Sequence, residues 1–130
     1  MKATIHSDGG SRGNPGPAAI GVVIELPDKK IEIGERIGVA TNNVAEYRAI
    51  IRGLEEAQKN KATEVECYLD SELVVRQIKG EYRIKDPKMI ELASRVFVLR
   101  DSFDFIVFYS IPREKNKAAD KLVNKALDTN

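Results

Sequence analysis

Four acidic side chains occupy places in this sequence where apolar residues would be expected. Asp8 and Asp70 each end an apolar run that has the pattern of a strand, while Glu46 and Asp120 lie on the apolar sides of two helical patterns. A carboxylate among apolar residues is costly unless something pairs with it. We therefore expect these four acids to converge on a common ligand, and a divalent metal ion is the first candidate.

Asp8 and Asp70 are expected to lie side by side. The strand that ends at Asp70 follows a predicted helix, so it should pair in parallel with the strand that ends at Asp8. Residues that follow neighbouring parallel strands meet beyond the same edge of the sheet. Two carboxylates ~4 Å apart repel by about 1 kcal/mol in water and about 4 kcal/mol near a protein surface, so a cluster needs shared protons, basic partners or a cation. Ligands that are all oxygen favour a hard ion, Mg²⁺ or Mn²⁺.

A separate local role for each acid is the simpler alternative. Asp70 precedes Ser71 at the start of a predicted helix, where it can act as a cap. Asp120 can form an ion pair with Lys117 or Lys121, its neighbours in the last predicted helix. Periodicity alone leaves both interpretations open.

The composition is that of a folded domain of ordinary size. The chain has 130 residues, of which 32% are charged and 42% hydrophobic, and its formal net charge is +1. This length predicts a single domain over residues 1–130. The small net charge gives no overall field that would draw the protein onto a polyanion, so a nucleic acid would have to be held by local patches.

Cysteine and histidine are too rare for several kinds of site. The single cysteine, Cys67, lies in an apolar run and is predicted to be a buried structural thiol. The single histidine, His6, is predicted to be a near-core residue without a catalytic role. These counts exclude an internal disulfide and a zinc site of cysteine and histidine. The sequence shows no apolar signal segment and no stretch of membrane-spanning length, so a cytoplasmic protein is expected.

Hydrophobic periodicity predicts strands and helices in the order βββαβααβα. Strands are expected at about 3–8, 18–26, 31–39, 65–70 and 103–111, and helices at about 44–59, 72–79, 87–99 and 117–127. Asn43 is a suitable N-cap for the first helix and Ser71 for the second. The last strand is apolar nearly throughout, which is typical of a strand covered on both faces. The order predicts an α/β fold, in which a five-stranded mixed sheet of three antiparallel strands and two parallel additions is flanked by helices.

Four segments of the chain resemble type 1 ribonuclease H, in the same order and at suitable spacing. They are SDGGSRGNPGP at 7–17, TNNVAE at 41–46, LDS at 69–71 and NKAAD at 116–120. A turn that contains Asp-Gly is a weak signal alone, but the four segments together span nearly the whole chain. The resemblance implies the ribonuclease H-like fold, in agreement with the predicted order of elements.

The resemblance also implies an activity, the endonucleolytic hydrolysis of the RNA strand of an RNA–DNA hybrid with 3′-hydroxyl and 5′-phosphate products. Asp8, Glu46, Asp70 and Asp120 match the four metal-ligating acids of the family, and Asp8 would bridge two ions. Two Mg²⁺ or Mn²⁺ ions would activate the attacking water and stabilise the leaving 3′ oxygen. No protein nucleophile is then required, which suits a chain without a Ser-His-Asp set.

Further residues match family positions that contact the substrate. They are Gly9, Gly10, Asn14, Thr41, Asn42 and Asn43. In the glycine turn, the missing Cβ atoms would let the backbone meet the 2′-hydroxyls that distinguish RNA from DNA. The polar segment 41–43 would hold the backbone and the minor-groove edges of the nucleic acid. A stiff hairpin loop is the plain structural interpretation of the segment 14–17.

Three departures from the familiar bacterial pattern concern binding and turnover. The loop 112–116 lacks the mobile histidine of many members, and Arg113 or Glu114 is a candidate to assist in its place. Glu72 stands where a glutamine that contacts substrate is common. The basic, tryptophan-containing handle of some members is absent, and a short basic patch remains there: Lys79, Arg83, Lys85 and Lys88.

Two other functions fit parts of the sequence. A module of the same fold could bind hybrid or structured RNA without cutting it, although the presence of all four acids argues against this. A phosphatase or phosphotransferase could use Asp8 as a nucleophile, but it would need a second acid where Gly10 stands. The expected partner is thus an RNA–DNA hybrid, with no membrane and no organic cofactor, and the protein is taken as a monomer by default.

Overall fold

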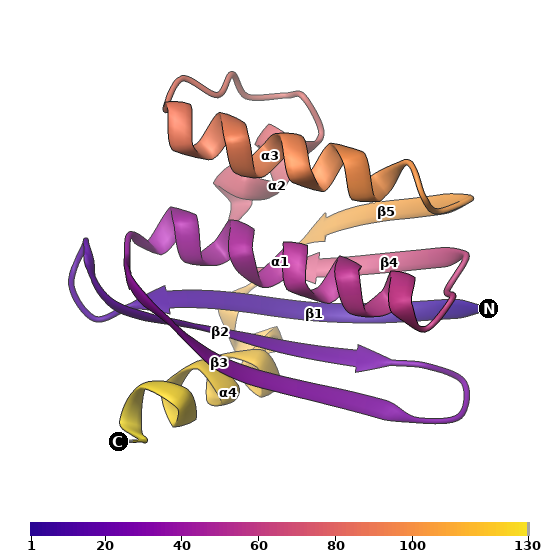
Figure 1. Cartoon of the computed structure of the whole chain (residues 1–130), viewed down its shortest axis with the longest axis horizontal. Helices are drawn as coiled ribbons and strands as arrows, with labels where there is room; N and C mark the ends of the chain where they lie inside the picture. The colour runs from indigo at the N-terminus through magenta and orange to yellow at the C-terminus, as the bar shows by residue number, and fades with distance from the viewer. Residues whose placement is uncertain (130) are drawn as a thin grey trace.

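The chain adopts the predicted order of elements (Figure 1), and the computed structural model describes residues 1–129. The strands are β1 (Lys2–Ser11), β2 (Gly16–Glu25), β3 (Lys30–Ala40), β4 (Glu64–Leu69) and β5 (Phe105–Ser110). The helices are α1 (Asn42–Lys59), α2 (Glu72–Ile78), α3 (Pro87–Arg100) and α4 (Lys117–Asp128), and the short 3-10 helix η1 (Arg113–Lys115) precedes α4.

The five strands form one mixed sheet in the order β3-β2-β1-β4-β5. β1, β2 and β3 pair antiparallel, and β4 and β5 are then added in parallel on the other side of β1. This arrangement confirms the predicted α/β fold. In the register of β1 with β4, Ser7 pairs with Leu69, so that Asp8 and Asp70 are the next residues of their two chains at the same end of the sheet.

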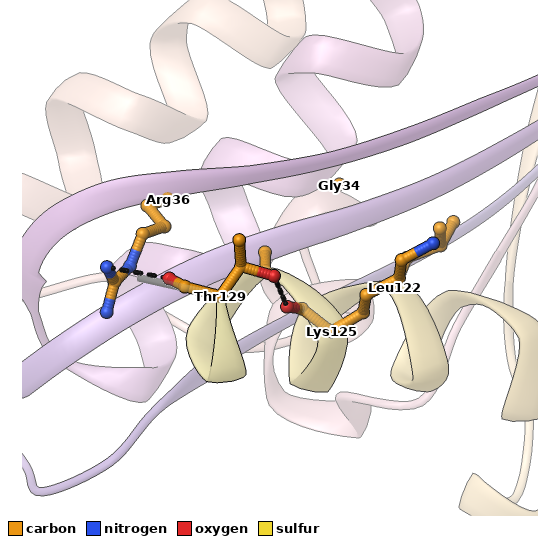
Figure 2. A pocket seen from close by; sticks show the side chains of 6 residues that line it. Gly34, Arg36, Leu122, Lys125 and Thr129 are labelled. Atoms are coloured by element: carbon orange, nitrogen blue, oxygen red, sulfur yellow. Dashed lines mark hydrogen bonds between the residues drawn. The ribbon is translucent and has the colours of Figure 1, made fainter.

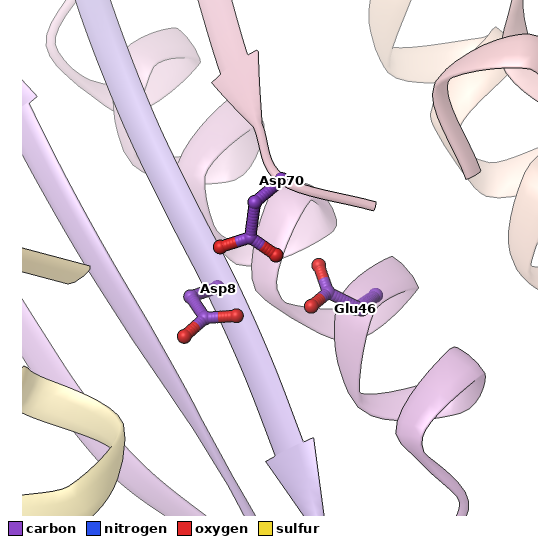
Figure 3. Close-up of side chains that lie close together, drawn as sticks. All are labelled: Asp8, Glu46 and Asp70. Atoms are coloured by element: carbon purple, nitrogen blue, oxygen red, sulfur yellow. The ribbon is translucent and has the colours of Figure 1, made fainter. Parts of the chain in front are cut away.

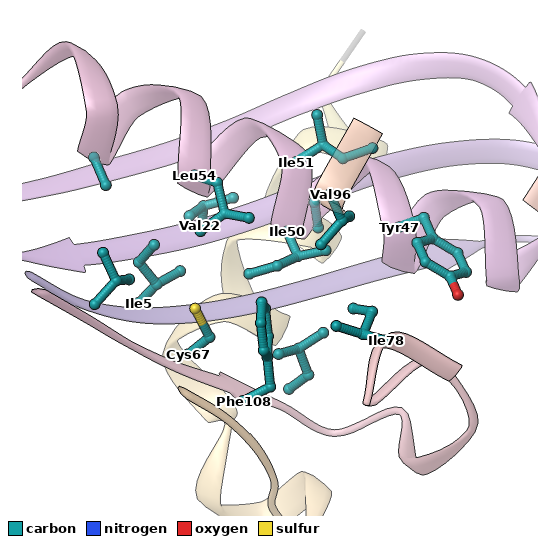
Figure 4. Close-up of a cluster of buried hydrophobic side chains, with 14 of the residues drawn as sticks. Ile5, Val22, Tyr47, Ile50, Ile51, Leu54, Cys67, Ile78, Val96 and Phe108 are labelled. Carbon is teal, nitrogen blue, oxygen red and sulfur yellow. The ribbon is translucent and has the colours of Figure 1, made fainter. Parts of the chain in front are cut away.

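Helices cover both faces of the sheet (Figure 1). α1 and α3 lie on one face, and α4 crosses the opposite face beneath β1, β2 and β3. The main core lies between α1 and the sheet, where Ile5, Val22, Ile50 and Leu54 are inaccessible to solvent (Figure 4). Cys67 belongs to this core and burial raises the pKa of its thiol, so the prediction of a structural cysteine is confirmed. Within residues 1–129, no helix is long and apolar enough to cross a membrane.

The first hairpin and the start of α1 differ in detail from the sequence prediction. β1 continues to Ser11 and β2 begins at Gly16, because the antiparallel pairing of the two strands extends to the pair of Ser11 with Ala18. The Ser11 hydroxyl also donates to the carbonyl of Ala40 at 2.7 Å. Thr41, rather than Asn43, is the N-cap of α1, since its Oγ1 accepts the N–H of Val44 at 3.2 Å. Ser71 caps α2 as predicted.

The expectation that the last strand is covered on both faces was wrong. β5 is an edge strand, and α4 does not extend across it, so only the face toward α1 and α3 is buried. Phe108 points into the core at 5% exposure, whereas Phe105 and Tyr109 are 56% and 42% exposed. On the open face Tyr109 stacks on Tyr68, which stacks on His6, and this row of rings accounts for the apolar composition and for the half-buried histidine.

Candidate active site

Three of the four predicted acids meet at one end of the sheet (Figure 3). Each of Asp8, Glu46 and Asp70 offers a carboxylate oxygen, and these oxygens all lie within 4.8 Å of one another. Asp8 comes from β1, Asp70 directly follows β4, and Glu46 comes from the first turns of α1. The prediction that Asp8 and Asp70 lie side by side is confirmed.

Glu46 reaches the cluster because α1 lies against β1 without an intervening side chain. A Cβ atom built at Gly9 would lie only 2.1 Å from the carbonyl carbon of Ala45, so only glycine permits this approach. The short distance also brings the backbone of Gly9 close to the Glu46 carboxylate, where it lowers the pKa of Glu46 and so partly offsets the effect of burial. The glycine after Asp8 therefore positions the second acid as well as the first.

Burial and mutual repulsion raise the pKa values of two of these acids. Asp8 and Glu46 are each only 7% exposed. Burial, followed by the charges of Asp70 and Asp120, raises the pKa of Asp8 to about 7. Burial, followed by the charge of Asp8, raises the pKa of Glu46 well above its usual range. Oε2 of Glu46 is also buried and has no hydrogen-bond partner within residues 1–129.

This donor set fits a divalent cation. The three carboxylates form no ion pair with a lysine or arginine within residues 1–129, so they repel one another, and a buried oxygen without a hydrogen bond is a cost to the folded state. A hard ion such as Mg²⁺ or Mn²⁺ removes both costs, because it prefers carboxylate oxygens. Asp8, Glu46 and Asp70 are therefore the residues that would hold such an ion.

Asp120 lies beside this cluster but outside the group of three. Its approach depends on Gly21, the register partner of Asp8, where a Cβ atom would lie 2.1 Å from the carbonyl oxygen of Ala119. α4 therefore packs closely on the sheet, and Asp120 comes near enough to Asp8 to raise its pKa. Asp120 makes no ion pair with Lys117 or Lys121 within residues 1–129, so the alternative of a local salt bridge is not what the structure shows.

The acids open into a polar cavity of about 450 Å³. Of the residues predicted to contact substrate, four line it: Gly9, Gly10, Asn42 and Asn43. Arg113 also lines the cavity, whereas Glu114, Asn14 and Thr41 do not. Arg12 is a further lining cation that the sequence reasoning did not single out, and it forms an ion pair with Asp128 at 2.6 Å.

Asn14 and Asn42 fix the first hairpin to the start of α1. The backbone N–H of Asn42 donates to Oδ1 of Asn14 at 3.1 Å, and Oδ1 of Asn42 accepts the N–H of Ser11 at 2.8 Å. In the described part of the chain, neither side-chain NH₂ group makes a hydrogen bond. Both residues thus use their carbonyl oxygens for structure and keep two donors each for a ligand.

Asn116 is a site residue whose role the sequence analysis did not identify. It is buried at 1% exposure, and its Nδ2 donates to the carbonyl of Ser7 at 2.8 Å and to Oδ2 of Asp70 at 2.9 Å. It stands four residues before Asp120 at the start of α4. Its place at the start of the segment NKAAD, one helical turn before the predicted ligand Asp120, is the sequence signal that could have indicated it.

A second hollow lies between β3 and α4, away from the acids (Figure 2). Its lining comprises Gly34, Arg36, Leu122, Lys125, Ala126 and Thr129 and contains no carboxylate. Arg36 donates to the carbonyl of Thr129 at 3.1 Å, and the Thr129 hydroxyl donates to the carbonyl of Lys125 at 2.7 Å. These contacts close the C-terminal end of α4 against the sheet, so this hollow is a packing seam.

The fold and the acidic site define a class of α/β protein in which a mixed sheet presents carboxylates suited to a hard cation. Residues 6–126 match the protein family described as Reverse transcriptase-like. The chain is similar to the solved RNase H1 of the halophilic archaeon Halobacterium salinarum, with 41% sequence identity, coverage of 98% of each chain and a TM-score of 0.94. The chain belongs to the type 1 ribonuclease H family, as its four sequence segments predicted.

Two other relatives are similar to nearly the whole of this chain. A bifunctional protein of Mycobacterium tuberculosis is 45% identical over 98% of this chain, which spans only 36% of that protein. The solved N-terminal RNase H domain of that protein has 44% identity over 98% of this chain and 100% of its own, with a TM-score of 0.94. LC11-RNase H1, solved in complex with an RNA/DNA hybrid, has 46% identity over 97% of this chain and 96% of its own, with a TM-score of 0.90.

Proposed function

We propose that this chain is an endoribonuclease that hydrolyses the RNA strand of RNA–DNA hybrids. The observation that carries the proposal is the group of Asp8, Glu46 and Asp70, whose ligand oxygens lie within 4.8 Å of one another and which form no ion pair in the described part of the chain. Such a group costs stability in the absence of a cation, so folding alone does not account for it. Membership of the ribonuclease H family and the hybrid complex of LC11-RNase H1 support the choice of substrate.

The acids of this site hold the reacting centre in place. Asp8, Glu46 and Asp70 bind divalent cations, Mg²⁺ or Mn²⁺, and Asp120 completes the site from α4. When bound there, two such ions would supply an activated water and a stabilised leaving 3′ oxygen, and the products would carry a 3′-hydroxyl and a 5′-phosphate. The strands and α1 hold the three inner carboxylates before any ligand binds, so little reorganisation is required of the chain.

The polar rim of the cavity contacts the nucleic acid. Asn42 lines the cavity and Asn14 is bonded to it, and the NH₂ groups of these two exposed residues make no hydrogen bond within residues 1–129, which suits phosphate oxygens and base edges in a minor groove. Gly9 and Gly10 expose backbone beside the acids, where a 2′-hydroxyl can be recognised. Arg113 lies in the cavity lining and can contact a phosphate of the RNA strand, so we prefer it to Glu114 as the assisting residue of the loop.

The direct test is a cleavage assay with strand-specific labels. Purified protein is incubated with an RNA–DNA hybrid, an RNA duplex and a DNA duplex, in Mg²⁺, in Mn²⁺ and in EDTA. Asp8→Asn removes one ligand of the cluster, and Asp104→Asn, which changes an exposed acid in the loop before β5, is the matched control. We expect cleavage of the RNA strand of the hybrid alone, only with metal, and equally by the wild type and Asp104→Asn.

Two results would overturn this proposal. Hybrid binding without cleavage in either metal would identify a binding module of the same fold. Cleavage that persists in EDTA or in Asp8→Asn would show that the acidic cluster is not the reacting centre.

A further inference from the structure

Asn116 joins the three segments that carry the site's aspartates. Its Nδ2 contacts the backbone carbonyl of Ser7, the residue before Asp8, at 2.8 Å and the carboxylate of Asp70 at 2.9 Å. Its own carbonyl accepts the backbone N–H of Asp120 at 3.1 Å. A single buried residue therefore contacts β1, the end of β4 and the first turn of α4.

The orientation of the Asn116 amide is determined by its partners. The Ser7 carbonyl and the Asp70 carboxylate can only accept hydrogen bonds at this point, so the NH₂ group must face both. Both donors are then used, while Oδ1 is buried and has no partner within residues 1–129. A buried oxygen without a hydrogen bond costs stability, so packing alone does not favour an asparagine here.

Asp70 is the least enclosed of the three acids. Asp8 and Glu46 are buried, whereas Asp70 is half-buried and lies in the bend just after β4. Its hydrogen bond from Asn116 is the only one that the Asp70 side chain makes within residues 1–129. Without this contact, the Asp70 carboxylate would be free to rotate away from the other two acids.

We infer that Asn116 is a positioning residue that holds the Asp70 carboxylate in the orientation that binds the divalent cation. The inference rests on the proposed function of the same acids. Outer partners that orient ligating carboxylates typically change metal affinity or activity by roughly 10–100-fold when they are removed. Asn116 also fixes the first turn of α4 relative to the end of β4, so it holds Asp120 in a defined position relative to Asp70.

The test measures Mn²⁺ binding, by isothermal titration calorimetry, in the wild type and in Asn116→Ala. We expect the dissociation constant for Mn²⁺ to rise by roughly 10–100-fold in Asn116→Ala. The matched control is Asn60→Ala at the far end of α1, which removes an Nδ2 hydrogen bond of 2.8 Å to the carbonyl of Glu56. This control should bind Mn²⁺ like the wild type.

Two further readouts separate positioning from a merely structural role. Hybrid binding in EDTA should be unchanged in Asn116→Ala, because the substitution alters the orientation of the metal ligand Asp70 and not a contact with the substrate. Cleavage by Asn116→Ala should need more Mn²⁺ but approach the wild-type rate at saturation. A Mn²⁺ dissociation constant within twofold of the wild type, or a loss of cleavage that saturating Mn²⁺ does not restore, would overturn the inference.

A measurement on the wild type covers the case in which Asn116→Ala does not fold. The side-chain NH₂ resonances of Asn116 are followed by NMR during a titration with Mg²⁺. We expect them to shift with the metal in the wild type and to lose this response in Asp70→Asn. If the backbone around Asp8 responds to Mg²⁺ and the Asn116 amide does not, only the positioning role fails. If the wild type binds no divalent ion by either method, the proposed function fails with it.

Discussion

Gly9 in β1 lies in direct backbone contact with Ala45 in α1, and this contact places Glu46 beside Asp8. From the sequence, Gly9 is predicted to contact the substrate, because the family resemblance places it near the 2′-hydroxyls. The structure adds a requirement of the fold, since a Cβ atom at this position would overlap the carbonyl group of Ala45 at 2.1–2.2 Å. Gly9 is therefore constrained by packing on one side and faces the cavity on the other.

Gly9→Ala should damage both folding and metal binding. The added methyl group must push α1 away from β1, and overpacking of this kind costs roughly 1–3 kcal/mol. The displacement moves Glu46 from the cluster, so Mn²⁺ affinity should fall as well. Urea unfolding and Mn²⁺ titration of the variant measure the two effects.

Gly10→Ala is the control for this prediction. A Cβ atom at Gly10 would approach only the Val123 side chain, at 3.2 Å, and a side-chain methyl can move by the small distance required. We expect stability and Mn²⁺ affinity near those of the wild type, with weaker binding of the hybrid if the Gly10 backbone contacts it. Equal stability losses in the two variants would show that the Ala45 contact does not constrain the strand.

The four acids should differ in importance. Asp8→Asn and Asp70→Asn each remove a member of the three-carboxylate group, so cleavage should fall to the level seen in EDTA while the fold is kept. Asp120→Asn removes an acid outside that group and should retain measurable cleavage, with a higher requirement for Mg²⁺. Cleavage rates as a function of Mg²⁺, with circular dichroism as the folding control, measure this order. Inactivation of Asp120→Asn at every Mg²⁺ concentration would place Asp120 among the essential ligands.

The metal-free protein should lose stability as the pH rises toward neutrality. The folded state raises the pKa of Asp8 from 3.8 to about 7, so between these values the folded protein holds a proton that the unfolded chain has released. Stability is therefore greatest below pH 4 for this group and is lost as the pH rises to about 7. Glu46 shifts in the same direction, whereas His6, whose pKa is lowered by burial, opposes the trend.

A comparison with Asp8→Asn isolates this contribution. In EDTA, the Tm of the wild type should fall between pH 5 and pH 7.5 by several degrees more than the Tm of Asp8→Asn, which carries no charge at this position. Mg²⁺ at pH 7.5 should raise the Tm of the wild type and have less effect on the variant. Parallel pH profiles of the two proteins would mean that Asp8 does not titrate in this range.

The sequence was sufficient for the sheet and for the cluster because both follow from local patterns. Alternating apolar residues and a single helical crossover determine that β4 lies beside β1, and Asp8 and Asp70 must then meet at the carboxyl ends of those strands. Glu46 was predictable because its distance from Ile50 places it on the inward side of α1. The approach of α1 to Gly9, however, is set by packing that no local pattern records.

The features that the sequence did not reveal depend on contacts between distant segments. Asn116 and Ser7 are 109 positions apart, and nothing near either residue indicates their hydrogen bond. The sequence of β5 predicts a strand covered on both faces, because its exposed face carries Phe105 and Tyr109. Composition does not show which strands α4 covers. Thr41 and Asn43 are both suitable caps, and the choice between them depends on Asn42, whose side chain bonds to Ser11.

The basic patch at 79–88 should supply part of the affinity for the hybrid. Lys79, Arg83, Lys85 and Lys88 are all exposed and form no ion pair within residues 1–129, so each can release counterions from a phosphate backbone. Replacing Lys85 and Lys88 with alanine should weaken binding in EDTA and lower the slope of log affinity against log salt by roughly one for each charge removed. The control replaces two exposed lysines at the opposite end of the sheet and helix, Lys29 and Lys59, and should leave the slope unchanged. Equal slopes in the two double variants would show that the patch does not contact the nucleic acid.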